Sequence, residues 1–277
     1  MSDGMALRPV ESFDPALRQR VLSAVVLALG AAAAVFVGGW LFAALVLVAV
    51  LIMAHEWAVL AAPGSPWPMA VATGGVACLA ILALQLGMPT TAFAMALAGP
   101  LLAAGALLLL RAGPPGGTAL GALYVGLPPL SLVWLRNNVP SGFEHVMWLL
   151  LVVWSTDVCA YFVGRTVGGP KLAPRISPGK TWAGLLGGIA GATLLGGLAG
   201  WAAGAGFWFP ATIAVVLAGI SQVGDLFESG LKRRAGVKDS GHLIPGHGGL
   251  LDRIDGLIFA VPVFAAIVWL FMSGGPS

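Results

Sequence analysis

Charged residues are scarce in this sequence of 277 residues: they make up 9% of it, whereas an ordinary soluble domain has roughly 25%. Hydrophobic residues make up 58%. Polar stretches are short, at most about 20 residues, so the chain has no room for a soluble domain. These shortages exclude a soluble globular enzyme and indicate an integral membrane protein.

Cysteine is rare as well. Cys78 and Cys159 lie far apart, each within an apolar run, so we interpret them as small buried hydrophobic residues rather than as a disulfide or a thiolate metal site. Basic residues are also few, with a net charge of +3, and they lie between apolar runs. This distribution argues against nucleic acid as a partner.

Nine apolar runs, each close to the roughly 20 residues that a helix needs to cross the hydrocarbon core, predict an all-α polytopic fold. They cover residues 21–37, 40–61, 69–87, 91–110, 118–135, 145–164, 181–202, 207–231 and 254–272. We divide the chain into a polar surface tail (1–20), an N-terminal group of membrane helices (21–140) and a C-terminal group with its loops (141–277). The first run resembles a signal peptide, but a second run follows after only Gly38 and Gly39, so we treat it as a retained span.

The positive-inside rule supports this count of spans. With a cytoplasmic N-terminus and nine spans, 13 of the 14 Lys and Arg residues fall in cytoplasmic segments, and Arg136 alone falls outside. The C-terminus is then outside. Glycines recur in the seventh run at spacings of three to five residues, which predicts close helix packing, either within one subunit or between two.

The stretch from Ser229 to Asp255 concentrates the polar residues of the chain. Its ionisable residues are Lys232, Arg233, Arg234, Lys238, Asp239, His242, His247, Asp252, Arg253 and Asp255. A basic cluster alone would indicate a surface patch for anionic lipid, but carboxylates weaken such an attraction. Glycines at 246, 248 and 249 let the loop turn tightly or approach a ligand closely. The combination indicates a phosphate and metal site.

Four ionisable residues lie inside otherwise apolar runs: His55, Glu56, Asp157 and Asp225. An ionised carboxylate at the centre of a membrane helix costs about 2.5 to 3.5 kcal/mol on insertion scales. Cations, a metal ion or water must therefore offset these charges. For Glu56 we favour a buried, paired carboxylate with a packing role over a catalytic one.

The spacing of the aspartates suggests a cation site. On a helix, Asp225 shares one face with Glu228 or Ser229 and with Lys232, at spacings of three, four and seven, and Asp252 and Asp255 share a face at the start of the last span. Two helices that bring such carboxylates together could hold Mg²⁺, which prefers oxygen ligands and bridges substrate phosphates. The alternative is a structural ion pair between Asp252 and Lys232 or Arg253.

A second polar segment runs from Ile176 to Trp182. Here Lys180 and two hydroxyl residues, Ser177 and Thr181, precede the expected start of a helix. A helix N-terminus beside such groups favours anion binding. The segment lacks the spacing of a Walker A loop.

Thirteen residues carry a resemblance to a known family. They are Ser229, Leu231, Lys232, Arg233, Lys238, Asp239, Pro245, His247, Gly248, Gly249, Asp252, Arg253 and Asp255. In this order and at this spacing they resemble the signature of the phosphatidate cytidylyltransferases, or CDP-diacylglycerol synthases. Asp157, Ser177, Pro178, Lys180, Thr181 and Trp182 resemble a second motif of the same family, in which Gly179 and Ala183 stand where Lys and Glu are usual.

The resemblance implies transfer of a cytidylyl group from CTP to phosphatidic acid at the cytoplasmic face of a bacterial cytoplasmic membrane. It implies metal ligation by Asp225 and Asp252, catalytic roles for Lys232, Lys238, Asp239, His247, Arg253 and Asp255, and substrate binding by Asp157, Ser177, Lys180, Thr181, Arg233, Gly248 and Gly249. The expected cofactor is Mg²⁺. One Mg²⁺ does not neutralise a triphosphate and a lipid phosphate, which leaves room for a second cation. A homodimer is expected from the resemblance alone.

Two other functions stay open at this point. A CTP-dependent polyprenol or phytol kinase would share the general site but move a different phosphoryl group. A secondary transporter would use Glu56, Asp157 and Asp225 as an ion pathway, although transporter sites usually lie near the bilayer midplane between related repeats. No repeat is evident in this sequence.

Overall fold

The computed structural model describes residues 30–241 and 248–273. Eight helices in these ranges are long and apolar enough to cross a membrane. They are α2 (Gly39–Ala61), α3 (Pro66–Gln85), α4 (Pro89–Leu109), α5 (Pro115–Asn137), α6 (Gly142–Val167), α7 (Trp182–Ala202), α8 (Trp208–Arg234) and α9 (Leu251–Ser273). The prediction of an all-α polytopic membrane protein without a soluble domain is confirmed.

The last eight predicted spans correspond one by one to these helices. Of the first predicted span only residues 30–37 lie within the described ranges, and they are helical. Arg136 at the end of α5 donates to the backbone oxygens of Val35, at 2.5 Å, and Phe36, at 2.8 Å. A cation at the C-terminal end of a helix satisfies carbonyls that lack intrahelical partners. The one cation predicted to lie outside therefore tethers this segment to α5.

Three helices in the N-terminal half begin with proline. Pro66, Pro89 and Pro115 each occupy the first position of a helix, where the missing N–H costs nothing and the fixed φ suits the helix. The side chains on the outer faces of these helices are also apolar. Leu101, Leu102 and Leu109 on α4 are 72%, 73% and 86% exposed, as expected for side chains that face lipid tails.

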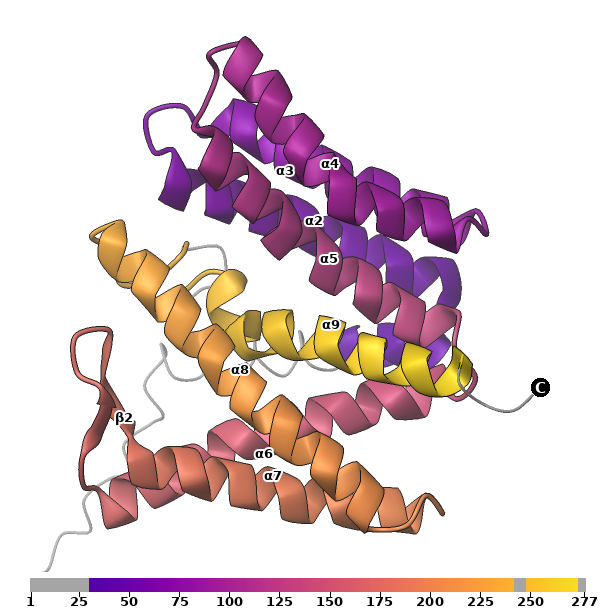
Figure 1. Ribbon diagram of the computed structural model, residues 1–277, viewed down its shortest axis with the longest axis vertical. Helices are drawn as coiled ribbons and strands as arrows, with labels where there is room; N and C mark the ends of the chain where they lie inside the picture. Colours follow the sequence, from indigo (N-terminus) through magenta and orange to yellow (C-terminus); the bar gives the residue numbers. More distant parts are fainter. Residues whose placement is uncertain (1–29, 242–247, 274–277) are drawn as a thin grey trace, which may run out of the picture.

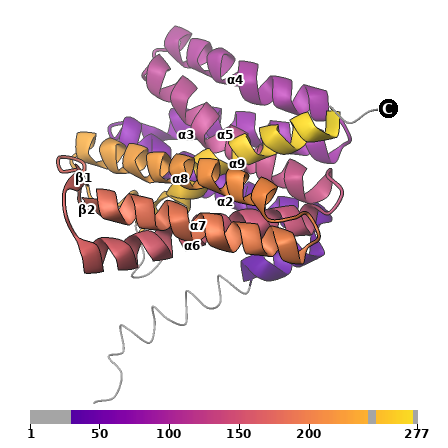
Figure 2. The same ribbon diagram turned by 60° about the horizontal axis from the view of Figure 1, so that its bottom comes forward.

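The helices form two groups with α9 between them (Figure 1). Helices α2 to α5 pack together in one group, and α6 to α8 form the other. Helix α9 packs against α5 on one side and against α8 on the other, and a view from below shows it at the centre of the molecule (Figure 2). Residues of α9, although late in the sequence, therefore lie at the boundary between the two groups.

Glycines explain how closely α6 and α7 pack. A Cβ atom added at Gly184 or Gly188 would lie 2.8 Å from a backbone oxygen of α6, and one at Gly187 would lie 2.5 Å from the Val163 side chain. Small residues let membrane helices approach at the backbone. The predicted glycine stripe thus packs within the chain, its first part against α6 and its last part, Gly197 and Gly200, against Phe207 and Pro210 at the start of α8.

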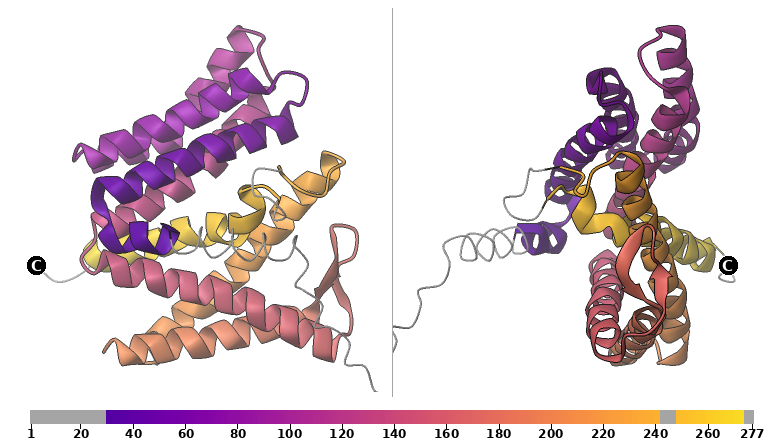
Figure 3. Two further views of the ribbon diagram at one scale, coloured as in Figure 1. Left: turned by 180° about the vertical axis from the view of Figure 1, so that it is seen from behind. Right: turned by 90° about the vertical axis from the view of Figure 1, so that its left-hand side faces the viewer.

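One element was not predicted. A two-stranded antiparallel hairpin, β1 (Lys171–Ala173) and β2 (Ser177–Thr181), joins α6 to α7, with Lys171 opposite Thr181. The segment lacks the alternating apolar pattern of a strand, so its sequence gave no strand signal. The hairpin projects from the helical body on the same side as the C-terminal end of α8 (Figures 1 and 3).

Candidate active site

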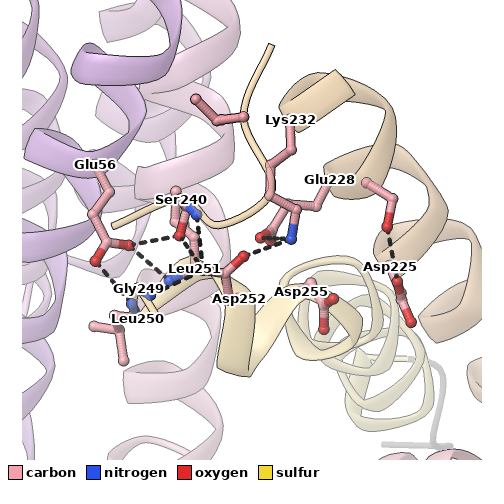
Figure 4. A network of polar contacts seen from close by, with 12 residues as sticks. Glu56, Asp225, Glu228, Lys232, Ser240, Gly249, Leu250, Leu251, Asp252 and Asp255 are labelled. Atoms are coloured by element: carbon pink, nitrogen blue, oxygen red, sulfur yellow. Dashed lines mark hydrogen bonds and ion pairs between the residues drawn. The ribbon is translucent and has the colours of Figure 1, made fainter. Parts of the chain in front are cut away.

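Polar side chains meet where the end of α8, the start of α9 and the end of β2 come together. The C-terminal half of α2 reaches the same place from the N-terminal group (Figure 4). Helix α8 continues to Arg234, past the predicted end at 231, and α9 begins at Leu251, before the predicted start at 254. As predicted, Asp225 and Lys232 therefore lie on one helix and Asp252 and Asp255 on another. These two helices supply most of the charges of the site.

Lys232 lies at the centre of one half of the site. Its ammonium group contacts Oε1 of Glu228 at 3.2 Å and Oδ1 of Asp252 at 2.5 Å. Glu228 is 1% exposed, and its other oxygen accepts a hydrogen bond from the Tyr124 hydroxyl of α5 at 3.3 Å. The site therefore includes a side chain from the N-terminal group of helices.

Asp252 is held by donors from the signature loop. Its Oδ2 atom accepts hydrogen bonds from the backbone N–H of Ser240 at 2.8 Å, the Ser240 hydroxyl at 2.9 Å and the backbone N–H of Gly249 at 2.9 Å. Gly248 has a φ of +80°, which favours glycine, and a Cβ at Gly249 would lie 2.2 Å from the Ser240 hydroxyl oxygen. The paired glycines thus allow the loop to close around this carboxylate.

A second chain of contacts links β2, α6 and α8. Lys180 forms an ion pair with Asp225 and donates to Oε1 of Gln222 at 3.0 Å. The Gln222 amide donates to Oδ1 of Asp157 at 3.1 Å. Thr181 caps α7, as its side chain accepts from the backbone N–H of Gly184 at 3.0 Å, which confirms the predicted helix start. Lys180 is thereby fixed beside two carboxylates.

A pocket of about 530 Å³ opens beside this second chain of contacts. Its wall contains Asp157, Lys180, Thr181, Gln222 and Asp225, together with Arg165, Lys171 and Tyr161. Three cations and two carboxylates therefore face one cavity, and its volume falls within the range of about 300 to 1,000 Å³ that is usual for small-molecule sites. The pocket suits a ligand with several negative charges.

Asp255 connects the two halves. It lies close enough to Asp225 and Asp157 for mutual repulsion, and Glu228 and Lys232 also act on it electrostatically. Five carboxylates, those of Asp157, Asp225, Glu228, Asp252 and Asp255, thus share the ammonium groups of Lys180 and Lys232. This excess of negative charge in a membrane protein favours binding of a cation.

The donor set fits Mg²⁺ in kind. Hard divalent cations prefer carboxylate oxygens, and Mg²⁺ usually takes one or two carboxylates and completes its shell with water and substrate phosphate. Within residues 30–241 and 248–273, no three His, Cys, Asp or Glu side chains are arranged to hold a metal ion by themselves. Two carboxylates with substrate phosphate as further ligands is thus the arrangement that these residues suit.

The sequence left two interpretations of Asp252 open, a metal ligand and a partner in a structural ion pair, and the geometry bears on both. The structural ion pair with Lys232 is present. Its Oδ2 atom is occupied by three donors, so the atom available to a metal ion is Oδ1, which Lys232 now contacts. Metal ligation by Asp252 stays a prediction.

Several predicted residues lie at the rim. Lys238, Asp239 and Arg253 are exposed, and Asp239 lies beside Gly248. Arg233 reaches back to the backbone oxygen of Ile176 at 3.4 Å and so joins α8 to the hairpin, which also carries Ser177. His247, predicted to be catalytic, lies outside the described residues, as does His242.

The sequence reasoning missed several residues that complete the site. Gln222, Glu228 and Ser240 each contact a predicted site residue, and Tyr124 contacts Glu228. The sequence placed Glu228 on the helix face of Asp225 and Lys232 without giving it a role, although opposite charges four positions apart on a helix meet. Tyr124 gave no local signal, since only the folded chain brings α5 to α8.

Comparison of this sequence with those of known proteins identifies its family. A sequence profile described as the cytidylyltransferase family matches residues 18–271. The chain belongs to the cytidylyltransferase family. The match extends over both helical groups, so the N-terminal helices that supply Tyr124 and Glu56 belong to the shared fold as much as the signature does.

Three relatives with assigned names are bacterial proteins. The chain is 42% identical to the phosphatidate cytidylyltransferase of Brucella melitensis over 265 residues, which cover 92% of this chain and 93% of the relative. It is 38% identical to the enzyme of the same name from Pseudomonas aeruginosa over 170 residues, 56% of this chain and 58% of the relative. The corresponding enzyme of Bacillus subtilis is 40% identical over 158 residues, 56% of this chain and 59% of the relative.

Proposed function

We propose that this protein is a membrane-embedded nucleotidyltransferase that transfers the cytidylyl group of CTP to phosphatidic acid, with CDP-diacylglycerol and pyrophosphate as products. The observation that carries the proposal is that α8 joins two ion pairs, Lys232 with Asp252 of the signature and Asp225 with Lys180, and that the second pair lines a pocket. The Brucella relative, which carries the name of this activity, matches nearly the whole chain and supports the same function.

The reaction needs little proton chemistry. A phosphate oxygen of phosphatidic acid attacks the α-phosphorus of CTP, a new P–O bond forms, and the bond between the α-phosphorus and the bridging oxygen to the β-phosphate breaks. Pyrophosphate leaves with that oxygen. Because the nucleophile is already anionic, a strong general base is unnecessary, and the main obstacle is repulsion between two polyanions. Catalysis then consists of positioning and of neutralising charge.

The cations of the site can position the substrate phosphates and neutralise their charge. Lys180 and Lys232 contact different carboxylates of the cluster, and each is already oriented by an ion pair, so either can bind a phosphate without a search for its position. Arg165 and Lys171 add charge to the wall of the pocket. Lys238 and Arg253 are exposed and are assigned as donors to the leaving pyrophosphate, and His247, which lies outside the described residues, is assigned the same role from the sequence alone.

Asp225 and Asp252 would hold Mg²⁺, with Asp255 as a further ligand or as a hydrogen-bond partner of bound water. A bound metal ion would neutralise charge at the α-phosphate of the cytidylyl group that is transferred. The excess of carboxylates over ammonium groups supports this assignment and leaves room for a second cation.

The membrane setting suits both substrates. Tyr161 lines the pocket and is 58% exposed, and the neighbouring Trp182 is 51% exposed. Aromatic side chains with a polar tip favour the boundary between hydrocarbon and headgroups. A lipid phosphate could reach the pocket from this boundary while CTP enters from water. We assign this end of the molecule to the cytoplasmic face, because the predicted topology places nearly all cations there.

Turnover of CTP labelled in the α-phosphate tests the proposal. Detergent-purified protein is mixed with phosphatidic acid, with and without Mg²⁺, and the lipid and aqueous products are separated. We expect labelled CDP-diacylglycerol and an equal amount of pyrophosphate, only with Mg²⁺ present. CDP together with a newly phosphorylated lipid, from an alcohol substrate, would instead show a CTP-dependent lipid kinase. Solute flux into proteoliposomes without any product would show a transporter.

A further inference from the structure

Glu56 brings a carboxylate from the N-terminal group of helices into the candidate active site. It lies in the C-terminal half of α2 and is 5% exposed. Its Oε1 atom accepts a hydrogen bond from the backbone N–H of Leu250 at 2.8 Å, and Oε2 accepts one from Leu251 at 2.9 Å (Figure 4). The carboxylate is therefore bound by the backbone at the start of α9.

These contacts replace an N-cap. The first N–H groups of a helix have no intrahelical partner, and a nearby anion also interacts favourably with the helix dipole. A cap is usually supplied by the residue just before the helix, but here it comes from α2, 194 and 195 positions earlier in the chain. Glu56 thereby fixes the first residue of α9, and Asp252 is the next one.

Ser240 gives Glu56 a second route to Asp252. The Ser240 hydroxyl oxygen lies 2.9 Å from Oδ2 of Asp252 and 3.3 Å from Oε2 of Glu56. A hydroxyl has a single proton, so it can donate to only one of these two carboxylates at a time. The shorter distance places the proton toward Asp252. If Asp252 moves toward a bound cation, the Ser240 hydroxyl can rotate and donate its proton to Glu56 instead. The hydroxyl then still has an acceptor.

The surrounding backbone is shaped to Glu56. A Cβ atom at Gly241 would lie 2.9 Å from Oε1 of Glu56, and one at Gly249 would lie 2.8 Å from the same atom. Gly241 follows Ser240 in the chain, and Ser240 and Gly249 are the residues that donate to Asp252. A side chain at either glycine would displace the carboxylate, so the fit of Glu56 depends on both of them.

We infer that Glu56 is a positioning residue for the carboxylate of Asp252, through the start of α9 and through Ser240. The inference rests on the proposed function, in which Asp252 would hold Mg²⁺ and the cations of the site would hold substrate phosphate. Glu56 itself contacts neither. It is a ligand-orienting group of the kind whose loss lowers metal affinity or activity by about 10- to 100-fold.

The test compares Glu56→Gln with wild type in two measurements. The first is binding of Mn²⁺ alone, followed by electron paramagnetic resonance, which needs no turnover. The second is the KM for CTP, which does not depend on the fraction of folded enzyme. In the variant, the NH₂ group of the amide must face a backbone N–H group that donated to the carboxylate in the wild type, so one hydrogen bond is lost. We expect Mn²⁺ to bind at least tenfold more weakly and the KM to rise.

Two further variants keep the test decisive. Ser240→Ala removes the hydroxyl but keeps the backbone donor to Asp252, and it should shift Mn²⁺ binding in the same direction by less. Trp148→Phe removes the hydrogen bond from Trp148 to the backbone oxygen of Gly196, far from Glu56, and so reports what general destabilisation does. We expect it to lower stability and leave Mn²⁺ affinity unchanged.

Each result decides the inference. Unchanged Mn²⁺ affinity and KM in folded Glu56→Gln would overturn it, even if wild type makes CDP-diacylglycerol. If Glu56→Gln does not fold, an unchanged Ser240→Ala would overturn it. A wild-type protein that binds no Mn²⁺ would overturn the metal assignment and this inference together. Absence of the lipid product alone, with the expected loss of Mn²⁺ binding in the variants, would overturn the proposed reaction and leave the positioning role standing.

Discussion

Lys232 on α8 donates to Oδ1 of Asp252 on α9 across 2.5 Å. Both side chains are largely buried, with 12% and 6% of their surface exposed. Breaking such a pair by removing one partner typically costs about 3 to 5 kcal/mol, because an uncompensated charge stays behind. The contact therefore serves stability, and it also occupies the carboxylate oxygen that a metal ion would need.

Lys232→Met separates these two roles. We predict that it lowers the free energy of unfolding in detergent by about 3 kcal/mol and removes cytidylyl transfer, since two carboxylates lose their counter-charge. The double variant Lys232→Met/Asp252→Asn removes a charge of each sign. It should recover only the part of the stability that belongs to Asp252, because buried Glu228 still lacks Lys232, and none of the turnover. A single variant as stable as wild type would contradict the structural role of the pair.

Asp225→Asn tests the other proposed metal ligand. The substitution keeps the size of the side chain and removes the charge that Lys180 contacts. We predict that the Mg²⁺ concentration for half-maximal turnover rises at least tenfold, because a carboxylate is a better ligand for Mg²⁺ than a neutral amide. Turnover measured against Mg²⁺ concentration checks this.

Glu144→Gln is the matched control for that experiment. Glu144 lies exposed in the first turn of α6, at the opposite end of that helix from Arg165 and the pocket. Its loss should leave the Mg²⁺ dependence unchanged. The assignment of Asp225 is wrong if both variants show the same Mg²⁺ curve as wild type.

Gln222 shows why part of the site escaped prediction from the sequence. It lies in an ordinary apolar run, and nothing local marks it. Its importance comes from geometry: α6 and α8 pack so that one amide meets Asp157 while its oxygen accepts from Lys180. An amide that links two charged residues is visible only once three distant segments have been placed together.

Other parts of the molecule could be read directly from the sequence. The apolar runs predicted eight helices of the described chain, because the bilayer fixes the length of a span and leaves little choice of structure. Spacing placed Asp225 and Lys232 on one face of α8. Glu56 was expected to be buried and paired, but its partners, the backbone at the start of α9 and Ser240, depend on contacts that no local pattern encodes.

Gln222→Met follows from the same geometry. The substitution keeps a similar volume and removes both hydrogen bonds to charged groups, each of which contributes about 1.5 to 3 kcal/mol. We predict that kcat/KM for CTP falls at least tenfold, which corresponds to about 1.4 kcal/mol. Steady-state kinetics with saturating phosphatidic acid checks the value. Unchanged kinetics would show that Lys180 and Asp157 do not need this link.

The α6–α7 contact yields the last prediction. A Cβ at Gly188 would lie 2.8 Å from the backbone oxygen of Thr156 and 3.0 Å from the Cβ of Ala160. Because backbone cannot move aside as a flexible side chain can, Gly188→Ala should separate the two helices and lower stability by about 1 to 3 kcal/mol. Thermal unfolding in detergent measures the loss, and turnover should fall with it, since Asp157 and Thr181 lie on opposite sides of this contact.

Gly219→Ala in α8 is the control that distinguishes packing from helix propensity. A Cβ at Gly219 would meet nothing within 4 Å, and the position is helical. Alanine favours a helix over glycine by up to about 1 kcal/mol, so this variant should be as stable as wild type or more stable. If both substitutions stabilise the protein equally, the close approach of α6 and α7 does not depend on glycine. If Gly188→Ala alone destabilises it, the stripe is what seats the β1–β2 hairpin and Lys180 against α8.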